Sequence, residues 1–595
     1  MTHEKYRAHS ARREDRADGS ILLTSGWPLG PVARCTTDWL EAWAAAAPDR
    51  VFLAERSGPG WREVSYSSAL TLVKAIAASL ADRGMGAGTP ILIISGNGVD
   101  HALLTLAAQY IGVPTVPVAE QYALIPGAHP VLERIAGMIR PAMVFADDVA
   151  RYGAALALPV FDGIEKVART GATEGMTPFS VLETGTTDVS ALNAKVGPNT
   201  VAKYLLTSGS TSHPKGVLTT QRMMTTNQAQ LKATLPFVTE KPPVLLDWLP
   251  WNHVFGGSHN FNLVLANGGT LYIDNGKPTP ALARHTIDNL RMVSPTIAFN
   301  VPVGFAVLRD AMKDDADLKR QYFQNLDMLF YAGASLPQDV WADLEAMAKE
   351  VRGDMPLFNS SWGLTETAPA ALLQYEFTHQ SGIIGVPLPE VTIKLVPADD
   401  DNRFDVRVKG DTITPGYLND PEKTAEAFDD EGYFITGDAM RFVDPADMTK
   451  GMKFDGRLAE EFKLNTGTWV RAAGLRLELL GKLKGLAQDI VLTGADRAEV
   501  GVMIVPTDAL RAGATDHQGA LSVTQADEIA RRLKPGPNEG SAHAVRRAQV
   551  LAEPPSMATG EITAKGNLNF RKLLLERKAL LDRLYDDADP ATIRV

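Results

Sequence analysis

The sequence has a single cysteine, and this scarcity excludes two kinds of site. With Cys35 alone, no disulfide can form within the chain and no zinc site can be built from cysteine ligands. A lone cysteine without a histidine signature nearby is a poor nucleophile candidate, so we interpret Cys35 as an ordinary thiol. The scarcity is also typical of a reducing compartment.

Long hydrophobic runs and an excess of positive charge are missing as well. A membrane-spanning helix needs about 18 consecutive apolar residues, and no such run occurs. The charged N-terminus lacks the apolar segment of a signal peptide, so we expect a cytoplasmic protein without membrane insertion. The formal net charge is −11. A nucleic-acid partner is therefore not expected, because such proteins usually carry a basic surface.

The 595 residues exceed the roughly 250–300 that a single core accommodates, so we expect several domains. Strands alternate with amphipathic helices, which predicts an α/β fold with doubly wound, largely parallel sheets. After Gly432 the strands become shorter and charge increases. We predict a mobile N-terminal tail over 1–25, a large domain over 26–456, a hinge at 457–459, and a smaller, mobile α+β domain over 460–595.

The pattern predicts individual elements as well. Apolar runs between turn residues predict strands, and apolar residues at helical spacing predict helices. The predicted strands are 51–55, 62–66, 90–95, 115–119, 244–250, 269–274, 296–302, 328–334 and 355–361, and the predicted helices include 37–47, 67–83, 101–112 and 571–585.

Three motifs follow predicted strands. TSGSTSHPKG (207–216) offers backbone N–H groups, hydroxyls and Lys215 to phosphate oxygens, although a hydrophilic surface loop is the alternative. SWGLTETAP (361–369) offers a flat indole and Glu366, a ligand suited to Mg²⁺, but TET alone is equally typical of a helix N-cap. YFITGDAMRFVD (433–444) places Asp438 where it could bind ribose hydroxyls, yet turn-stabilising aspartates are commoner.

Together with FDGRLAEEFKLNTGTWV (454–470) and GEITAKGNLNFR (560–571), these motifs resemble the adenylate-forming superfamily of acyl-CoA synthetases, peptide-synthetase adenylation domains and luciferases. WLPWNHVFGGSHNFNLVL (248–265) and FNVPVGF (299–305) further resemble the feruloyl-CoA synthase family. The resemblance extends from about Leu29 to Tyr585.

The resemblance implies a role for each matching residue. The catalytic residues would be Lys565, Thr365, Glu366 as the Mg²⁺ ligand, Lys215, and His253 as an aromatic gate. The alternative for His253 is a histidine at the edge of the core. Contacts to ATP or AMP would come from Thr207, Ser208, Gly209, Ser210, Thr211, Gly333, Ala334, Trp362, Asp438 and Arg457. The acid pocket would include Trp251, Phe255, His259 and Asn260, with Gly256 and Gly257 leaving room for a ring. Lys463 and Gly467 would lie in the loop that serves thioester formation.

The sequence departs from the superfamily pattern at four places. Ser212 stands where glycine is usual, Trp362 replaces a tyrosine, and Ala459 replaces a hinge aspartate or lysine. The C-terminal lysine usually follows a glycine directly, whereas here Gly560 precedes Glu561. The spacing of ITAKG in feruloyl-CoA synthases assigns this role to Lys565, with Lys572 as the alternative.

The resemblance implies an ATP-dependent acid–CoA ligase that forms an acyl-AMP and then the CoA thioester of ferulate or a related hydroxycinnamate, with Mg²⁺ as cofactor. It allows a homodimer, and the pathway expected from the family is catabolism of lignin-derived phenylpropanoids. Four alternatives remain: a ligase for another aryl acid, one for a medium-chain acid, an enzyme that loads a carrier protein, and a non-catalytic nucleotide-binding homologue. No carrier domain follows within the sequence, which favours free CoA.

Overall fold

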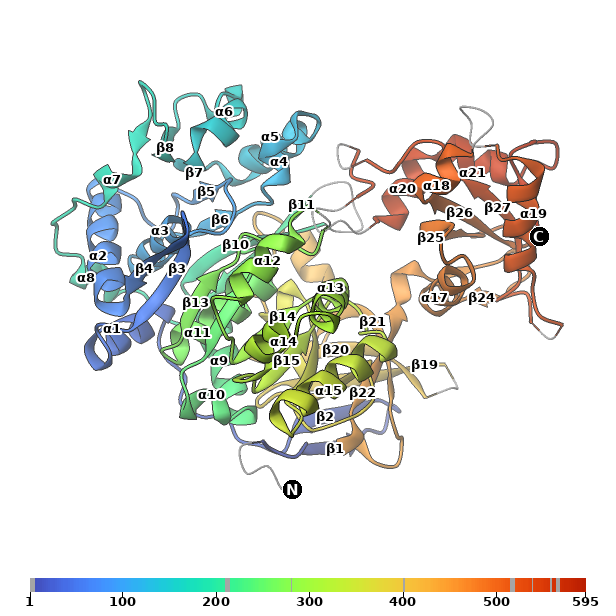
Figure 1. Ribbon diagram of the computed structural model, residues 1–595, viewed down its shortest axis with the longest axis horizontal. Helices are drawn as coiled ribbons and strands as arrows, with labels where there is room; N and C mark the ends of the chain where they lie inside the picture. Colours follow the sequence, from blue (N-terminus) through green and yellow to red (C-terminus); the bar gives the residue numbers. More distant parts are fainter. Residues whose placement is uncertain are drawn as a thin grey trace.

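The computed structural model describes residues 6–208, 214–279, 281–399, 402–513, 520–537, 539–556, 559–562 and 568–595. Its largest element is an 11-stranded sheet, which runs through the lower part of the molecule (Figure 1). In spatial order the strands are β1 (Ala11–Asp15), β2 (Ile21–Ser25), β19 (Thr392–Asp399), β20 (Arg403–Lys409), β21 (Phe434–Phe442), β22 (Met452–Arg457), β18 (Ile383–Pro387), β17 (Ala370–Gln374), β16 (Leu357–Gly363), β15 (Met328–Tyr331) and β14 (Ile297–Asn300).

Two further sheets complete the large domain. The seven-stranded sheet has the order β11 (Pro214–Thr220), β10 (Val201–Ser208), β6 (Thr115–Pro117), β5 (Ile91–Ile93), β7 (Met143–Asp148), β8 (Glu165–Thr170) and β9 (Thr177–Pro178). The four-stranded sheet has the order β12 (Val244–Asp247), β13 (Thr270–Ile273), β3 (Val51–Ser57) and β4 (Gly60–Ser65).

Helices cover these sheets on both faces, as the sequence predicts for a doubly wound architecture. Along β14–β16, Ala298, Leu329 and Phe358 face the cluster built with α13–α15, whereas Phe299 and Phe330 face the main core. The longer helices of this domain are α1 (Thr36–Ala46), α2 (Tyr66–Asp82), α3 (Val99–Tyr110), α5 (His129–Ile139), α6 (Val149–Leu156), α9 (Gln221–Thr234), α11 (Phe261–Ala266), α12 (Ala283–Leu290), α13 (Pro302–Lys313), α14 (Ala316–Phe323) and α15 (Gln338–Arg352).

The sheets are less uniformly parallel than the sequence pattern predicts. The seven-stranded sheet is parallel except for the β10–β11 hairpin. In the 11-stranded sheet, only β14, β15 and β16 pair in parallel, and the strands from β16 through β22 to β1 pair antiparallel. Short antiparallel strands joined by tight turns carry no helix between them, so a helix–strand alternation does not reveal them.

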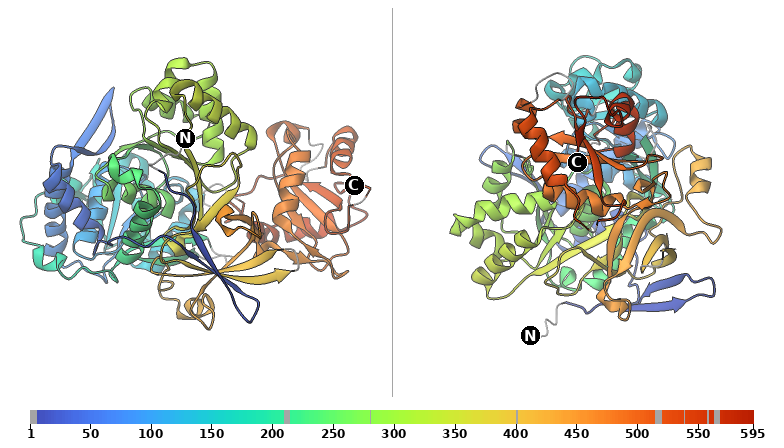
Figure 2. Two further views of the ribbon diagram at one scale, coloured as in Figure 1. Left: turned by 90° about the horizontal axis from the view of Figure 1, so that it is seen from below. Right: turned by 90° about the vertical axis from the view of Figure 1, so that its right-hand side faces the viewer.

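The predicted mobile tail over 1–25 is wrong for its described part. β1 and β2 form a hairpin whose inner strand pairs with β19 (Figure 2). Ile21 and Leu23 on β2 are buried in the main core, while most of β1 is exposed, which explains its charged composition. Tyr6 also donates a hydrogen bond to the Asp327 carbonyl oxygen at 2.8 Å. The large domain therefore begins well before residue 26.

The C-terminal residues form a separate lobe with its own core (Figure 1). The predicted helix over 571–585 is interrupted at Arg577. The elements of the lobe are β23 (Phe462–Lys463), β24 (Trp469–Val470), α17 (Ala472–Lys482), β25 (Ala487–Thr493), β26 (Val500–Pro506), α18 (Asp508–Ala512), α19 (Val523–Leu533), β27 (Val545–Val550), α20 (Phe570–Glu576), α21 (Lys578–Leu584) and β28 (Ile593–Arg594).

The junction between the lobes follows β22, which ends at Arg457. A short 3₁₀ turn spans Leu458–Glu460 and leads to β23. Buried Arg403 on β20 bonds Asp455 before this turn at 2.7 Å and also pairs with Glu461 after it. Residues 457–459 therefore lie between the two cores, and their action as a hinge stays a prediction.

Within the described parts of the chain, every helix falls short of the length or hydrophobicity that crossing a bilayer requires.

Candidate functional site

The centre of the candidate site is a hydrogen bond between two strands that are not neighbours. Trp362 on β16 donates from Nε1 to Oδ2 of Asp438 on β21 at 2.8 Å. Three strands separate β16 from β21 in the sheet order, and at ~4.8 Å per strand a flat sheet would hold them roughly 19 Å apart. The sheet must therefore curl strongly, and this curl brings two predicted nucleotide contacts together.

Asp438 is buried, and on the neighbouring strand it faces Arg457, which is also a predicted nucleotide contact. The β21–β22 register sets Asp438 opposite Arg457, and Arg457 Nε lies 3.4 Å from Asp438 Oδ1. Burial raises the pKa of Asp438, although the charge of Arg457 and the indole bond oppose this rise. Among the described residues, Oδ1 has no hydrogen-bond donor. A buried acceptor without a donor fits a residue that binds ligand hydroxyls.

A second group assembles around Glu366, in the 3₁₀ turn Thr365–Thr367 that follows β16. Tyr417 donates its hydroxyl to Glu366 Oε1 at 3.1 Å, and Lys215 Nζ lies 4.8 Å from the centre of the Tyr417 ring. Burial and the Glu366 charge raise the pKa of Tyr417, so the phenol stays protonated and donates. The turn also buries Thr365. Tyr417 thus lies between Glu366 and Lys215, and the roles that the resemblance implies for these two residues stay predictions.

The β10–β11 hairpin carries the first predicted motif. Thr207 pairs with Lys215 across the hairpin, and the backbone of Ser208 pairs with Pro214. Residues 416–418 continue this edge, since Leu218 N–H donates to Gly416 O and Leu418 N–H donates to Gly216 O. The motif residues Gly209, Ser210, Thr211 and Ser212 lie outside the described residues.

Gly333 and Ala334 follow the carboxyl end of β15 and are exposed there. Gly333 has a φ of +88°, which side-chain-bearing residues rarely adopt. Ligands of open α/β sheets bind at such strand ends. Since β15 and β16 run parallel, Gly333 and Ala334 lie at the same edge of the sheet as Trp362, near the end of β16, and Glu366, just after it.

His253 stands just before a π-helical turn, Phe255–Asn260, and its Nδ1 accepts a hydrogen bond from Phe255 N–H at 3.3 Å. This turn packs closely against residues 249–251. A Cβ at Gly256 would lie 2.4 Å from Leu249 O, and one at Gly257 would lie 2.1 Å from Trp251 O. The expectation that these glycines leave room for a ring is therefore wrong, because the backbone of 249–251 fills that space.

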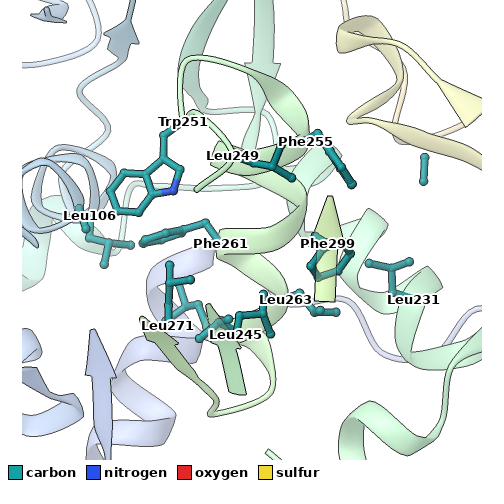
Figure 3. Packing of buried hydrophobic residues seen from close by; sticks show 14 of the residues in the cluster. Leu106, Leu231, Leu245, Leu249, Trp251, Phe255, Phe261, Leu263, Leu271 and Phe299 are labelled. Carbon is teal, nitrogen blue, oxygen red and sulfur yellow. The ribbon is translucent and has the colours of Figure 1, made fainter. Parts of the chain in front are cut away.

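Two predicted acid-pocket residues lie in one aromatic cluster. His259 and Phe255 pack with Phe299 on β14 and Phe330 on β15, with ring centroids 5.1–5.7 Å apart. Trp251 does not join them. Its ring packs against His101 and Phe261 on the other side of the turn (Figure 3).

Polar side chains form hydrogen bonds with the π-helical turn that carries Phe255 and His259. Asn260 bridges His259 Nδ1 at 2.9 Å and Asp247 Oδ2 at 2.8 Å. Burial raises the pKa of Asp247 to about 7. Lys203 on β10 donates to Gly257 O at 2.5 Å, and burial lowers its pKa to about 8. The π-helical turn is therefore held by side chains from two sheets, with Asp247 on β12 of the four-stranded sheet and Lys203 on β10 of the seven-stranded sheet.

Among the described residues of the C-terminal lobe, Lys463 and Lys572 lie on elements of that lobe, and Gly467 lies between two of them. Lys463 is exposed on β23, and Gly467, with a φ of +90°, turns the chain towards β24. Lys572 pairs with Glu576 at 2.5 Å. Lys565 lies outside the described residues.

Sequence patterns missed Tyr417, Phe299, Phe330 and Asp247. Phe299, Phe330 and Asp247 lie on strands that the apolar runs did predict. A side chain that alternates inward on such a strand is a candidate lining residue, and this signal could have found them. Tyr417 bridges to Val217 on β11 and lies far from Glu366 in the sequence, so no local pattern indicates its contact with Glu366.

The donor set around Glu366 fits a magnesium ion held jointly with nucleotide phosphates. Among the described residues, no group of three or more His, Cys, Asp or Glu side chains could hold a metal by itself. Mg²⁺ is usually bound by one or two carboxylates together with substrate phosphates. Glu366, in the turn beside Lys215, supplies one such carboxylate.

We expect buried His101 on α3 to make the stability of the fold dependent on pH. Burial lowers its pKa to about 4, below the 6.5 of an unfolded chain. Between these values the unfolded chain binds the extra proton, so stability falls as pH falls from 6.5 to 4. We expect His101→Phe to reduce the loss of unfolding free energy between pH 7 and pH 5 by about 2 kcal/mol. Urea denaturation at both pH values measures this loss.

Replacement of the exposed His285 by glutamine is the control, and it should leave the loss of unfolding free energy at the parent value. An equal loss in His101→Phe and the parent protein would contradict the prediction.

Comparison with known proteins finds sequences that are similar to this chain over much of its length. A carboxylic acid reductase of Mycobacterium marinum is 25% identical over 593 residues, which cover 89% of this chain and 47% of the reductase. The chain thus spans about half the length of that relative. The 4-coumarate–CoA ligase 4 of Arabidopsis thaliana is 23% identical over 410 residues, covering 66% of this chain and 68% of the ligase.

Among solved structures, the A domain of carboxylic acid reductase from Segniliparus rugosus, in complex with AMP and a co-purified carboxylic acid, matches with a TM-score of 0.69 and 19% identity. The match covers 93% of this chain and 94% of that chain. The fold is therefore the α/β fold of adenylate-forming enzymes, with a large N-terminal and a small C-terminal domain.

A family model described as AMP-binding enzyme matches residues 40–418. This stretch is more than half of the chain, and it includes the β10–β11 hairpin, Trp362, Glu366 and Tyr417. The chain belongs to the AMP-binding enzyme family.

Proposed function

We propose that this protein is an ATP-dependent acid–CoA ligase, and that its acid is ferulate or a related hydroxycinnamate. The observation that carries the proposal is the convergence of Trp362, Asp438 and Arg457 on one side and Glu366, Tyr417 and Lys215 on the other. The first group provides an indole face and a buried carboxylate for a nucleoside. The second provides a cation and a metal-binding carboxylate for its phosphates.

A carboxylate is a poor acceptor for a thiol, so the first half-reaction must install a leaving group. The carboxylate oxygen of the acid attacks the α-phosphorus of ATP, a P–O bond forms, and pyrophosphate leaves. Lys215 and Lys565 would offset the negative charge that gathers on the phosphates, and Mg²⁺ on Glu366 would add to that neutralisation. Asp438 would hold the ribose, which fixes the position of the α-phosphate.

In the second half-reaction the CoA sulfur attacks the acyl carbonyl, the thiol proton is lost, and AMP leaves. Lys463 ends β23, and Gly467 lies in the turn that leads to β24. We propose that the C-terminal lobe rotates about 457–459 between the two steps and brings this turn to the acyl-adenylate. Arg403 pairs with Asp455 before the junction and with Glu461 after it, so such a rotation would have to change the Arg403–Glu461 pair.

The aromatic cluster supports an aryl acid. Phe255, His259, Phe299 and Phe330 offer ring edges and faces to a planar ligand. We expect thioester and AMP to form in equal amounts with ferulate and 4-hydroxycinnamate, with higher specificity constants than with benzoate or octanoate. Higher constants with octanoate would keep the reaction and change the acid. If none of these acids gives AMP, the proposal is overturned.

Carrier loading is the second candidate, because the solved A-PCP didomain of the carboxylic acid reductase from Segniliparus rugosus also matches this chain, with a TM-score of 0.68 and 19% identity. Transfer of a radiolabelled acyl group separates the two functions. A CoA ligase labels free CoA, whereas a carrier-loading enzyme labels only a phosphopantetheinylated carrier protein.

A further inference from the structure

One ring nitrogen of His259 has no hydrogen-bond partner in the part of the chain that the structure describes. The side chain is 1% exposed, and its ring is surrounded by the rings of Phe255, Phe299 and Phe330 at centroid distances of 5.3–5.5 Å. Nδ1 is bonded to Asn260, but Nε2 has no hydrogen-bond partner among the described residues. A buried polar atom in an aromatic surrounding loses its bond to water and gains nothing in return.

The hydrogen-bond chain fixes which nitrogen carries the proton. Asn260 donates from Nδ2 to Asp247 Oδ2, so its Oδ1 faces His259 and accepts from Nδ1–H. The other Asp247 oxygen accepts from Leu249 N–H at 3.0 Å, which holds the carboxylate in place. Burial lowers the pKa of His259 to about 4, so the ring is neutral at pH 7. Nε2 therefore presents a lone pair and can only accept.

The lone pair lies where the end of a bound acid opposite to its carboxylate would reach. Phe299 pairs with Phe330 in the β14–β15 register, and Phe330 pairs with Asn359 on β16. Phe330 lies three residues before Gly333, and Asn359 lies three residues before Trp362. At ~3.3 Å per residue, the cluster lies about 10 Å below the edge where adenylation would occur. A planar aryl acid, with its carboxylate at that edge, would extend towards the cluster.

We propose that His259 Nε2 accepts a hydrogen bond from a hydroxyl group at the distal end of the acid, and that His259 thereby selects phenolic acids. The inference rests on the proposed function and deepens it. A hydroxyl donates to Nε2, whereas a hydrogen atom or a methoxy group at the same ring position offers no donor. The site then discriminates by leaving its buried acceptor unpaired when the wrong acid binds.

The first test uses the unmodified protein. Acid-dependent ATP–pyrophosphate exchange is measured with 4-hydroxycinnamate, cinnamate and 4-methoxycinnamate. We expect kcat/KM to be at least about tenfold higher for the hydroxy acid than for either analogue. Equal values for the three acids, or a preference for the methoxy acid, would overturn the inference while leaving the proposed function intact. Absence of exchange with every acid would overturn the proposed function and the inference with it.

The second test removes the acceptor. His259→Phe should lower the hydroxy-to-unsubstituted kcat/KM ratio about tenfold, towards one, whereas His259→Gln keeps an acceptor and should retain part of the preference. His101→Phe is the matched control, because His101 is a second buried histidine of the same core, bonded to Gly96 O at 2.9 Å. It should leave the ratio at the parent value. A purely structural role would not change this ratio, so an unaltered ratio in His259→Phe contradicts the proposal. If His259→Phe does not fold, the kcat/KM ratio of His259→Gln and the comparison of the three acids test the proposal instead.

Discussion

Replacing Asp438 with alanine is expected to reduce acid-dependent ATP–pyrophosphate exchange by about 10³-fold. The carboxylate accepts the indole bond of Trp362 and opposes Arg457, so its loss frees both predicted nucleotide contacts. It also removes the acceptor expected for the ribose hydroxyls. Hydrogen bonds to charged groups contribute about 1.5–3 kcal/mol each, and two such bonds account for an effect of this size. Isothermal titration with AMP should show a comparable loss of affinity.

Two further variants make this result specific. Asp438→Asn keeps an oxygen that can accept from Trp362 but removes the charge, so its activity should lie between the parent and the alanine variant. Asp444→Ala alters an exposed aspartate at the end of the same segment, where Oδ1 accepts from Ala446 N–H at 2.9 Å. We expect it to keep nearly full exchange activity. Unchanged AMP affinity in Asp438→Ala would remove Asp438 from the nucleotide site.

The strand ends that carry the site were predictable from the sequence, because each is an apolar run followed by glycine, serine or threonine. This applies to Gly333 after β15 and to Trp362 on β16. The bond between Trp362 and Asp438 was not predictable in the same way. It depends on the curl of a sheet in which three strands intervene, and periodicity along one strand carries no information on that curl.

The acid pocket shows a different limit. Trp251 and Phe255 lie four residues apart and look equivalent in the sequence, yet Trp251 precedes the π-helical turn and its ring lies on the opposite side from that of Phe255 (Figure 3). Gly256 and Gly257 are required by the close approach of residues 249–251, so small size here indicates packing and not an open space. The N-terminal hairpin was missed for a similar reason. Its outer strand is charged because one face meets solvent, and composition alone does not separate such a strand from a tail.

Replacing Lys565 with alanine should separate the two half-reactions. The residue matches the lysine that the resemblance assigns to adenylation, so exchange with ATP and acid should fall by about 10³-fold, because one cation that stabilises the transferring phosphate is lost. Thioester formation from supplied acyl-AMP and CoA involves no transfer at phosphorus. Its rate should therefore stay within a few-fold of the parent protein.

Lys572→Ala provides the matched control for this separation. Lys572 belongs to the same part of the chain, but it already pairs with Glu576 at 2.5 Å on α20, so it has a structural partner that accounts for its charge. We expect both half-reactions to survive its replacement. A reversed result, in which Lys572→Ala loses exchange and Lys565→Ala keeps it, would transfer the adenylation role to Lys572. Equal loss of both half-reactions in Lys565→Ala would indicate damage to the lobe, and the assignment of Lys565 to the first step would then be wrong.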